Sequence, residues 1–138
     1  REKHNMLVVC TSWEKLGHRS AIFDQGAVNV DIHGGEAETS IMLAMRPDLV
    51  DMERAEDFSS RQTELKADNS QLGFHSSNAN ISWLAEDLNP IGAVGNAEAA
   101  TAEKGRHEIY SAVDGFCTLM MEIDGTSRPT ANRFSGLE

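Results

Sequence analysis

The chain has 138 residues, of which 40% are hydrophobic and 25% charged, and its formal net charge is −10 at pH 7. This composition is typical of a soluble globular domain and excludes a disordered chain. The acidic balance argues against binding to nucleic acid or to anionic membrane surfaces, because both need clustered Lys and Arg.

No apolar run reaches the roughly 20 residues of a membrane span, and no signal peptide is visible. The two cysteines, Cys10 and Cys117, lie in separate apolar runs and form no CxxC pair. We predict buried free thiols in a reducing, cytoplasmic setting.

The first part of the chain predicts two strands and a helix. Residues 6–10 are a short apolar run with a β-branched pair, which is typical of a buried parallel strand. Residues 28–33 alternate between apolar and polar, so they predict a second strand that ends at His33. Two glycines follow, and the helical spacing of Ile41, Ala44 and Met45 then predicts a helix over 36–45, before Pro47.

The second part predicts a surface excursion and one long helix. Residues 51–82 are polar and read as an excursion over the surface or over a neighbouring subunit. The long helix starts at residue 97 or 102, capped by Asn96 or Thr101, and ends near residue 123. Its apolar face is made of Ile109, Ala112, Val113, Phe116, Leu119 and Ile123.

This order of elements suits the second half of an α/β sandwich, with helices on both faces of a sheet. Two or three strands alone make a poor sheet, so we expect other polypeptide to complete it.

His33 lies where a predicted strand ends and a helix begins, which is where open α/β sheets bind ligands. Gly34 and Gly35 let the backbone turn sharply, and the positive end of the helix favours an anionic group. His33 could act as an acid or base, or as a metal ligand. It could equally be a strand-end histidine bonded to backbone, with Glu36 and Glu38 supporting the helix start. The chain holds no HExxH and no recognisable complete metal site.

The residues from His33 to Ala44, His-Gly-Gly-Glu-Ala-Glu-Thr-Ser-Ile-Met-Leu-Ala, resemble the signature of the creatininase family, with Gly34 where Ala is usual. Residues 86–95 and 100–105 are similar to the family's C-terminal segments, and 6–17 resemble the strand before its active-site flap. The resemblance predicts that residues 1–124 are the C-terminal part of a creatininase-like domain and that 125–138 are a tail. Because the chain begins at Arg1, we expect a cleavage product, a truncated chain or a partial record.

The resemblance implies a three-layer α/β/α sandwich in an oligomer, often a hexamer. Family members bind one or two divalent metals, commonly zinc or manganese, and a metal-bridging water attacks a carbonyl carbon so that a C–N bond breaks. Most metal ligands lie in the N-terminal half, so the resemblance assigns none to this chain. It implies as partner the N-terminal half of the same precursor or a companion subunit.

The resemblance also implies roles for individual residues. His33 would be catalytic, as a proton shuttle or oxyanion partner. Glu38 would have a structural role, or would hold the residues that contact the substrate in position. Ile32 stands where creatininase proper has a glutamate, which argues against creatinine itself as substrate. Trp13 could belong to a flap over the substrate or to ordinary packing after a strand. The predicted substrate-binding residues are Trp13, Asp31, Gly34 and Glu36.

The resemblance therefore predicts part of a metal-dependent hydrolase that cleaves a cyclic amide, a formamide or a related C–N bond of a small polar molecule, active with an N-terminal partner. One alternative is a non-catalytic subunit that completes the fold of a hetero-oligomer. Another is a C–C bond hydrolase of a carbocyclic ketone.

Overall fold

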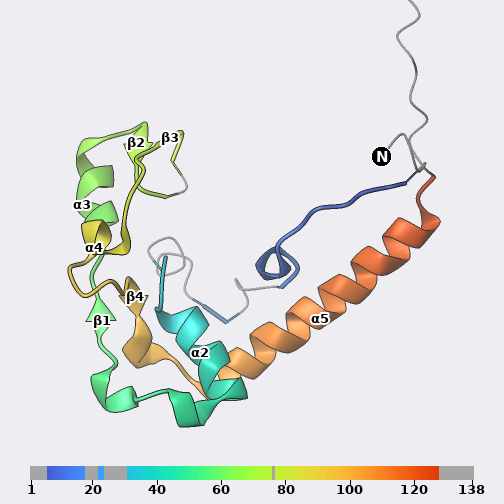
Figure 1. The fold of residues 1–138 in the computed structure, drawn as a ribbon, viewed down its shortest axis with the longest axis horizontal. Helices are drawn as coiled ribbons and strands as arrows, with labels where there is room; N and C mark the ends of the chain where they lie inside the picture. Colours follow the sequence, from blue (N-terminus) through green and yellow to red (C-terminus); the bar gives the residue numbers. More distant parts are fainter. Residues whose placement is uncertain (1–5, 18–21, 24–30, 76, 128–138) are drawn as a thin grey trace, which may run out of the picture.

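The computed structural model describes residues 6–17, 22–23, 31–75 and 77–127. In these ranges the α-helices are α2 (Glu36–Met45), α3 (Arg61–Asp68), α4 (Ala85–Leu88) and α5 (Ala102–Gly125). The strands are β1 (Asp57–Phe58), β2 (Leu72–Gly73), β3 (Ala79–Asn80) and β4 (Gly95–Asn96). Short 3-10 helices are η2 (Trp13–Lys15), η4 (Pro47–Leu49), η5 (Met52–Arg54) and η6 (Ala97–Ala99). Figure 1 shows an open arrangement, with α3, α4, β2 and β3 at one end and the C-terminal end of α5 at the other.

Helix α2 confirms the predicted helix at both of its bounds. Its N-cap, Gly35, has no side chain to offer, so the Oδ2 atom of Asp31 accepts the Ala37 N–H at 2.9 Å in its place. The helix ends at Met45 because Pro47 cannot continue it, and Pro47 begins η4 instead.

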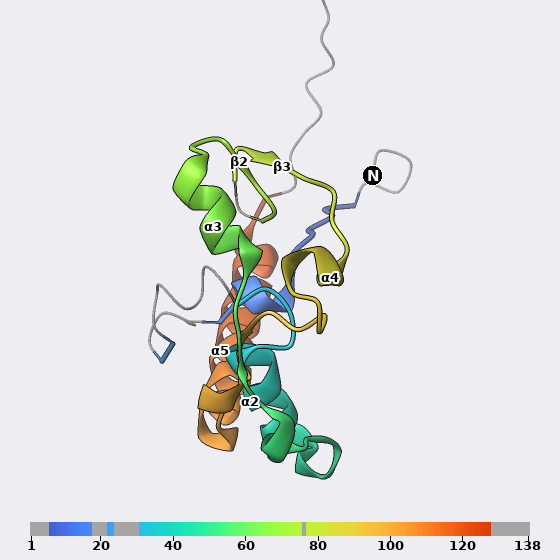
Figure 2. The same cartoon turned by 90° about the vertical axis from the view of Figure 1, so that its left-hand side faces the viewer.

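Helix α5 confirms the predicted long helix, with the second of the two predicted caps. Thr101 Oγ1 accepts the Lys104 N–H at 3.2 Å, while Asn96 caps η6. In Figures 1 and 2, α2 lies against the N-terminal end of α5.

Glycine sets how closely these two helices approach. A Cβ atom on Gly105 would overlap the carbonyl oxygen of Ser40 and lie 2.8 Å from the Ile41 nitrogen. Ser40 is fully buried there, and its hydroxyl accepts the Thr101 N–H at 3.1 Å. The bare glycine therefore lets the backbones of α2 and α5 come into contact.

The predicted polar excursion carries short elements of its own. β1 pairs antiparallel with β4, with Asp57 opposite Asn96 and Phe58 opposite Gly95, and β2 pairs parallel with β3. Phe74 of the excursion forms a small hydrophobic core with Leu88 and Val94. Trp83, which is partly buried beside that core, donates its indole N–H to the Phe74 carbonyl at 2.8 Å.

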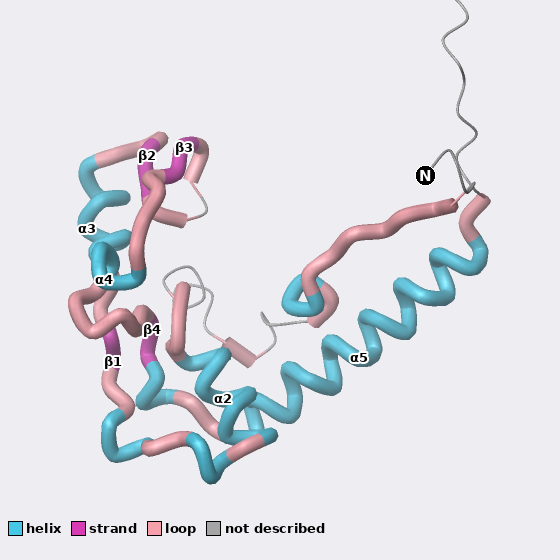
Figure 3. Tube along the Cα trace, in the orientation of Figure 1, coloured by secondary structure: helices cyan, strands magenta, loops and turns pink. Residues whose placement is uncertain are grey.

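The first predicted strand differs from the structure. Residues 6–10 form no strand within the described ranges and run as extended chain, drawn as loop in Figure 3, with Met6, Val8 and Val9 about half exposed. A buried strand needs neighbours on both edges, and the described residues supply none here. The predicted burial of the thiols is also wrong, because Cys10 and Cys117 are free but exposed.

Residues 28–30 of the second predicted strand lie outside the described residues. Its end is described, and His33 forms an antiparallel bridge with Val94. In the described ranges, none of the helices combines the length and hydropathy that crossing a membrane requires.

Candidate functional site

A short backbone bridge fixes His33 at the start of the site. The amides of Ile32 and His33 donate to the Val94 carbonyl at 3.0 and 3.1 Å, and the Val94 amide donates back to the His33 carbonyl at 2.6 Å. Val94 is fully buried, so the backbone of His33 is anchored on the core. Its imidazole is 61% exposed.

The two glycines after His33 are required by the turn. Gly34 has a φ of 66°, in the left-handed region that glycine adopts without strain. A Cβ atom on Gly35 would overlap the carboxylate of Asp31 and lie 2.8 Å from the Cα of Gly95. Asp31 therefore lies over this turn and caps α2, so its carboxylate holds the local backbone.

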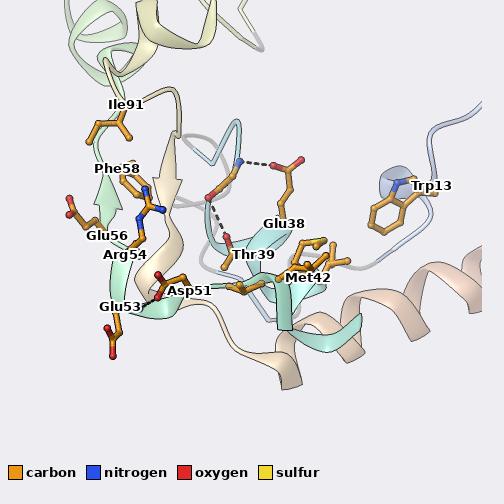
Figure 4. A pocket seen from close by; sticks show the side chains of 14 residues that line it. Trp13, Glu38, Thr39, Met42, Asp51, Glu53, Arg54, Glu56, Phe58 and Ile91 are labelled. Atoms are coloured by element: carbon orange, nitrogen blue, oxygen red, sulfur yellow. Dashed lines mark hydrogen bonds between the residues drawn. The ribbon is translucent and has the colours of Figure 1, made fainter. Parts of the chain in front are cut away.

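Glu38, in the first turn of α2, binds the glycine turn that precedes the helix. Its Oε2 atom accepts the Gly34 N–H at 2.6 Å and lies 4.0 Å from Nδ1 of His33. The hydroxyl of Thr39 donates to the Gly34 carbonyl at 3.2 Å, and Figure 4 shows both bonds to Gly34. Glu38 is therefore hydrogen-bonded to the glycine turn and lies near the imidazole without a hydrogen bond to it.

The amides at the start of α2 are partly used by the chain itself. Asp31 accepts from Ala37, and Glu38 accepts from Gly34. These two N–H groups already bind carboxylates, so they are not available to a substrate oxyanion.

Glu36 is directed into the helix pair. Its side chain is 10% exposed and forms an ion pair with Lys104 of α5, whose ammonium also donates to the Ala99 carbonyl at 2.9 Å. Sequence reasoning missed Lys104, because the two residues are 68 positions apart and no local pattern links them. The predicted substrate role of Glu36 stays a prediction.

A groove of about 970 Å³ brings three of the predicted residues together. Trp13, Gly34 and Glu38 line it, whereas His33, Asp31 and Glu36 are not among its described lining residues. Figure 4 shows Trp13 on one side, beyond Met42, and Arg54 and Phe58 on the other. The remaining lining residues are Thr39, Ile41, Leu49, Val50, Asp51, Glu53, Glu56 and Ile91.

The far wall of the groove comes from the polar excursion, which the sequence predicted to pack over the surface or over a neighbouring subunit. Arg54 is the cation among the described lining residues, and Phe58 stands above it on β1. The pairing of β1 with β4 brings this wall to the groove, and strands of two residues leave no periodic signal in the sequence.

Two side chains at the surface beside the groove, Arg46 and Asp48, have shifted pKa values. The guanidinium of Arg46 donates to both carboxylate oxygens of Asp48, at 2.8 and 2.6 Å, which lowers the pKa of Asp48 and raises that of Arg46. Both groups are exposed, so this pair concerns the end of α2 and not the chemistry at His33.

The described residues do not fit a complete metal site. Among them, no group of three or more His, Cys, Asp and Glu residues is placed to hold a metal ion. His33 and Glu38 make a pair, which is fewer than the three protein ligands of a catalytic zinc site.

Comparisons with known proteins converge on one family. The family model named Creatininase, with the description creatinine amidohydrolase, matches residues 1–120. A crystal structure from Bacteroides fragilis, of a candidate creatinine amidohydrolase, matches with a TM-score of 0.69 and 25% sequence identity. That match covers 91% of this chain and 46% of the other, so the chain spans about half the length of that protein. None of the curated proteins searched matches the chain. The structural match confirms the predicted α/β class and the creatininase-like fold.

Proposed function

Because the chain belongs to the creatininase family, we propose that it contributes the histidine-bearing part of the active site of a metal-dependent amidohydrolase. The substrate would be a small polar molecule with a cyclic amide, a formamide or a related C–N bond. Family membership and the likeness to the Bacteroides fragilis protein support the hydrolase class.

The observation that carries this proposal is the placement of His33 against Glu38. Nδ1 is the ring nitrogen on the Glu38 side, 4.0 Å from its Oε2 atom, and we assign contact with the substrate to the other nitrogen, Nε2. In amide hydrolysis, a bond forms from the water oxygen to the carbonyl carbon and the C–N bond breaks. His33 Nε2 would take a proton from the attacking water and give one to the departing nitrogen.

The chain's other residues would hold and shield this imidazole. Glu38 ties the glycine turn to α2, and Asp31 fixes the start of the helix. Trp13 lines the groove together with Gly34 and Glu38, so it would cover a small polar substrate that is bound there beside the turn after His33.

The metal that the family implies would need ligands that the described residues do not provide together. We propose that other polypeptide supplies the ligands of a zinc or manganese ion, in an oligomer such as a hexamer. The metal would supply Lewis-acid chemistry, and the steps of this chain are proton transfer at His33 and orientation of its imidazole.

The test is a His33→Ala substitution in the chain assembled with the polypeptide that completes its domain. Hydrolysis of creatinine, of a cyclic ureide and of an N-formyl compound would be followed by ammonia or amine release. We expect kcat to fall by about 10²-fold or more, with the assembly intact by light scattering. His107, an exposed histidine on α5, gives the matched control, and His107→Ala should leave kcat unchanged.

The second candidate is a non-catalytic subunit that completes the fold, and the metal donor set found among the described residues fits this role as well as it fits the catalytic one. It predicts that His33→Ala leaves turnover of the assembly unchanged. That result would remove the catalytic role of His33.

A further inference from the structure

The groove beside the glycine turn is larger than a single amide group needs. Its volume is about 970 Å³, and pockets of roughly 300–1,000 Å³ enclose whole small molecules. Gly34 and Glu38 line the groove next to His33, and Arg54 and Phe58 line the opposite wall (Figure 4). A substrate with its amide at the glycine turn therefore has room for a second part that reaches this wall.

Arg54 brings a positive charge to that wall. It is the last residue of η5, which Asp51 caps by accepting the Glu53 N–H at 3.2 Å. The guanidinium is exposed and makes no ion pair or side-chain hydrogen bond with the described residues. Its five N–H donors are therefore available to a ligand in the groove.

The carboxylates that line the groove leave Arg54 accessible. Glu38 accepts an N–H of the glycine turn, and Asp51 accepts an N–H within η5. In Figure 4, Glu53 and Glu56 extend away from α2, whereas Arg54 extends along the wall. Two carboxylates are thus bound to backbone, and the other two are directed away from the side of the groove where an anion would meet Arg54.

Backbone pairing joins this wall to His33. Phe58 of β1 lies opposite Gly95 of β4, and the preceding residue, Val94, forms the bridge with His33. The wall and the imidazole are therefore attached to the same short segment of backbone. Such an arrangement fixes the distance between the two ends of the groove, which suits recognition of a substrate by both of its ends.

We propose that Arg54 is a specificity-determining residue that binds an anionic group, a carboxylate or a phosphate, at the end of the substrate away from the amide. The inference rests on the proposed function, which places the amide at the glycine turn. A guanidinium forms two parallel, charge-assisted hydrogen bonds with such a group, and these are stronger than bonds to a neutral oxygen.

Charge makes this contact selective. The chain has a net charge of −10, so an anionic substrate gains affinity only where a cation meets it. Arg54 is that cation among the described lining residues. Phe58 and Ile91, on the same wall, would contact the carbon skeleton between the two polar ends. The substrate class is therefore a formamide or cyclic amide that carries a carboxylate or a phosphate.

The test compares two probes, N-formylglycine, which has a carboxylate, and N-formylglycinamide, which is neutral at that position. Their binding to the chain, assembled with the polypeptide that completes its domain, would be followed by NMR. The indole N–H signal of Trp13 reports on the groove, and that of Trp83, which bonds the Phe74 carbonyl, is the internal reference. Arg106→Gln, at an exposed position of α5 outside the described lining, is the matched control for Arg54→Gln.

We expect Arg54→Gln to raise the Kd of N-formylglycine about tenfold or more and to change that of N-formylglycinamide less than about twofold. Arg54→Lys should recover part of the affinity, because it keeps the charge but not the planar fork. Arg106→Gln should leave both Kd values unchanged. Competition by acetate and by inorganic phosphate then distinguishes a carboxylate from a phosphate as the preferred group. Circular dichroism of each variant checks that the helices are retained.

Three outcomes would overturn the proposal. One is an Arg54→Gln variant that binds N-formylglycine as tightly as the unchanged protein does. Another is a groove that prefers the cationic probe N-formylethylenediamine, which would assign the site to its carboxylates. The third is the absence of binding of any of the three probes. None of these readouts uses turnover, so Arg54-dependent binding of N-formylglycine without hydrolysis would count against the proposed function and not against the anion site.

Discussion

The two halves of α5 have similar apolar content but differ in what covers them. In the first half, Gly105, Glu108, Ser111 and Ala112 are buried, whereas no residue of the helix from 113 to 125 is. Phe116 continues the same predicted apolar face and is 53% exposed. The periodic spacing of apolar residues therefore identifies the face of a helix that is suited to packing. It does not say whether the residues that cover this face belong to the same chain.

The difference arises from the kind of contact at each end. The first half meets α2 through backbone contact at Gly105, a hydrogen bond from Thr101 to Ser40, and the Glu36–Lys104 ion pair. The second half meets the segment that contains η2, where a Cβ atom on Gly115 would lie 2.8 Å from the Leu16 carbonyl carbon. Helix α2 has three buried residues, Glu36, Ala37 and Ser40, whereas no residue of η2 is buried.

The largest effect should come from Gly105→Val. The new side chain would overlap the Ser40 carbonyl, and because both atoms belong to regular helix backbone, α2 and α5 must move apart. We expect the free energy of unfolding to fall by about 3 kcal/mol or more, measured by urea denaturation followed by circular dichroism.

Gly125, at the other end of the same helix, gives the control. A Cβ atom there meets nothing within 4 Å among the described residues. Gly125→Ala should leave stability unchanged or raise it by less than about 1 kcal/mol, because alanine favours helix. If Gly105→Val and Gly125→Ala lowered the free energy of unfolding equally, the first half of α5 would be no more tightly packed than its C-terminal end.

A smaller loss should follow from Lys104→Met. Glu36 is 10% exposed and would keep its carboxylate without the ammonium that binds it. Lys104 is 30% exposed, so water relieves part of the cost, and we expect a loss of about 1–2 kcal/mol at pH 7. Lys66→Met on the exposed face of α3 is the matched control. The double variant Glu36→Gln with Lys104→Met should recover part of the loss; if it recovers none, the pair is not what joins the helices.

The elements that the sequence predicted well are those with local signals. Helix α2 is delimited by the glycine turn and Pro47, and α5 by the cap at Thr101. His33 precedes α2 as predicted and forms a bridge with Val94, whereas most of the strand predicted to end at His33 lies outside the described residues. These signals act within a few residues, so a single sequence carries them.

The parts that the sequence could not predict depend on distant neighbours. Segment 6–10 has the composition of a buried strand, but its burial requires flanking strands that the described residues do not contain. At the site, the pairing of Glu36 with Lys104 and the wall formed by Arg54 and Phe58 join residues far apart in the chain. Three predicted residues, Trp13, Gly34 and Glu38, do line one groove, while the catalytic role of His33 stays a prediction.

The smallest effect on stability, and the sharpest test of the comparison, should come from Gly115→Ala. The methyl group would press against the Leu16 backbone and displace the segment that contains η2, but alanine also favours helix by about 1 kcal/mol over glycine. The two contributions oppose each other, so we expect the free energy of unfolding to change by less than about 1 kcal/mol.

The displaced segment should instead be seen by limited proteolysis, as faster tryptic cleavage after Lys15, with Gly125→Ala as the unaffected control. A loss of stability as large as that of Gly105→Val, with cleavage at Lys15 unchanged, would mean that the chain holds both halves of α5 equally. The exposed half would then need no partner to complete its packing. Rapid cleavage with unchanged stability would mean that the second half of α5 is only loosely covered by its own chain, as its exposed Val113 and Phe116 indicate.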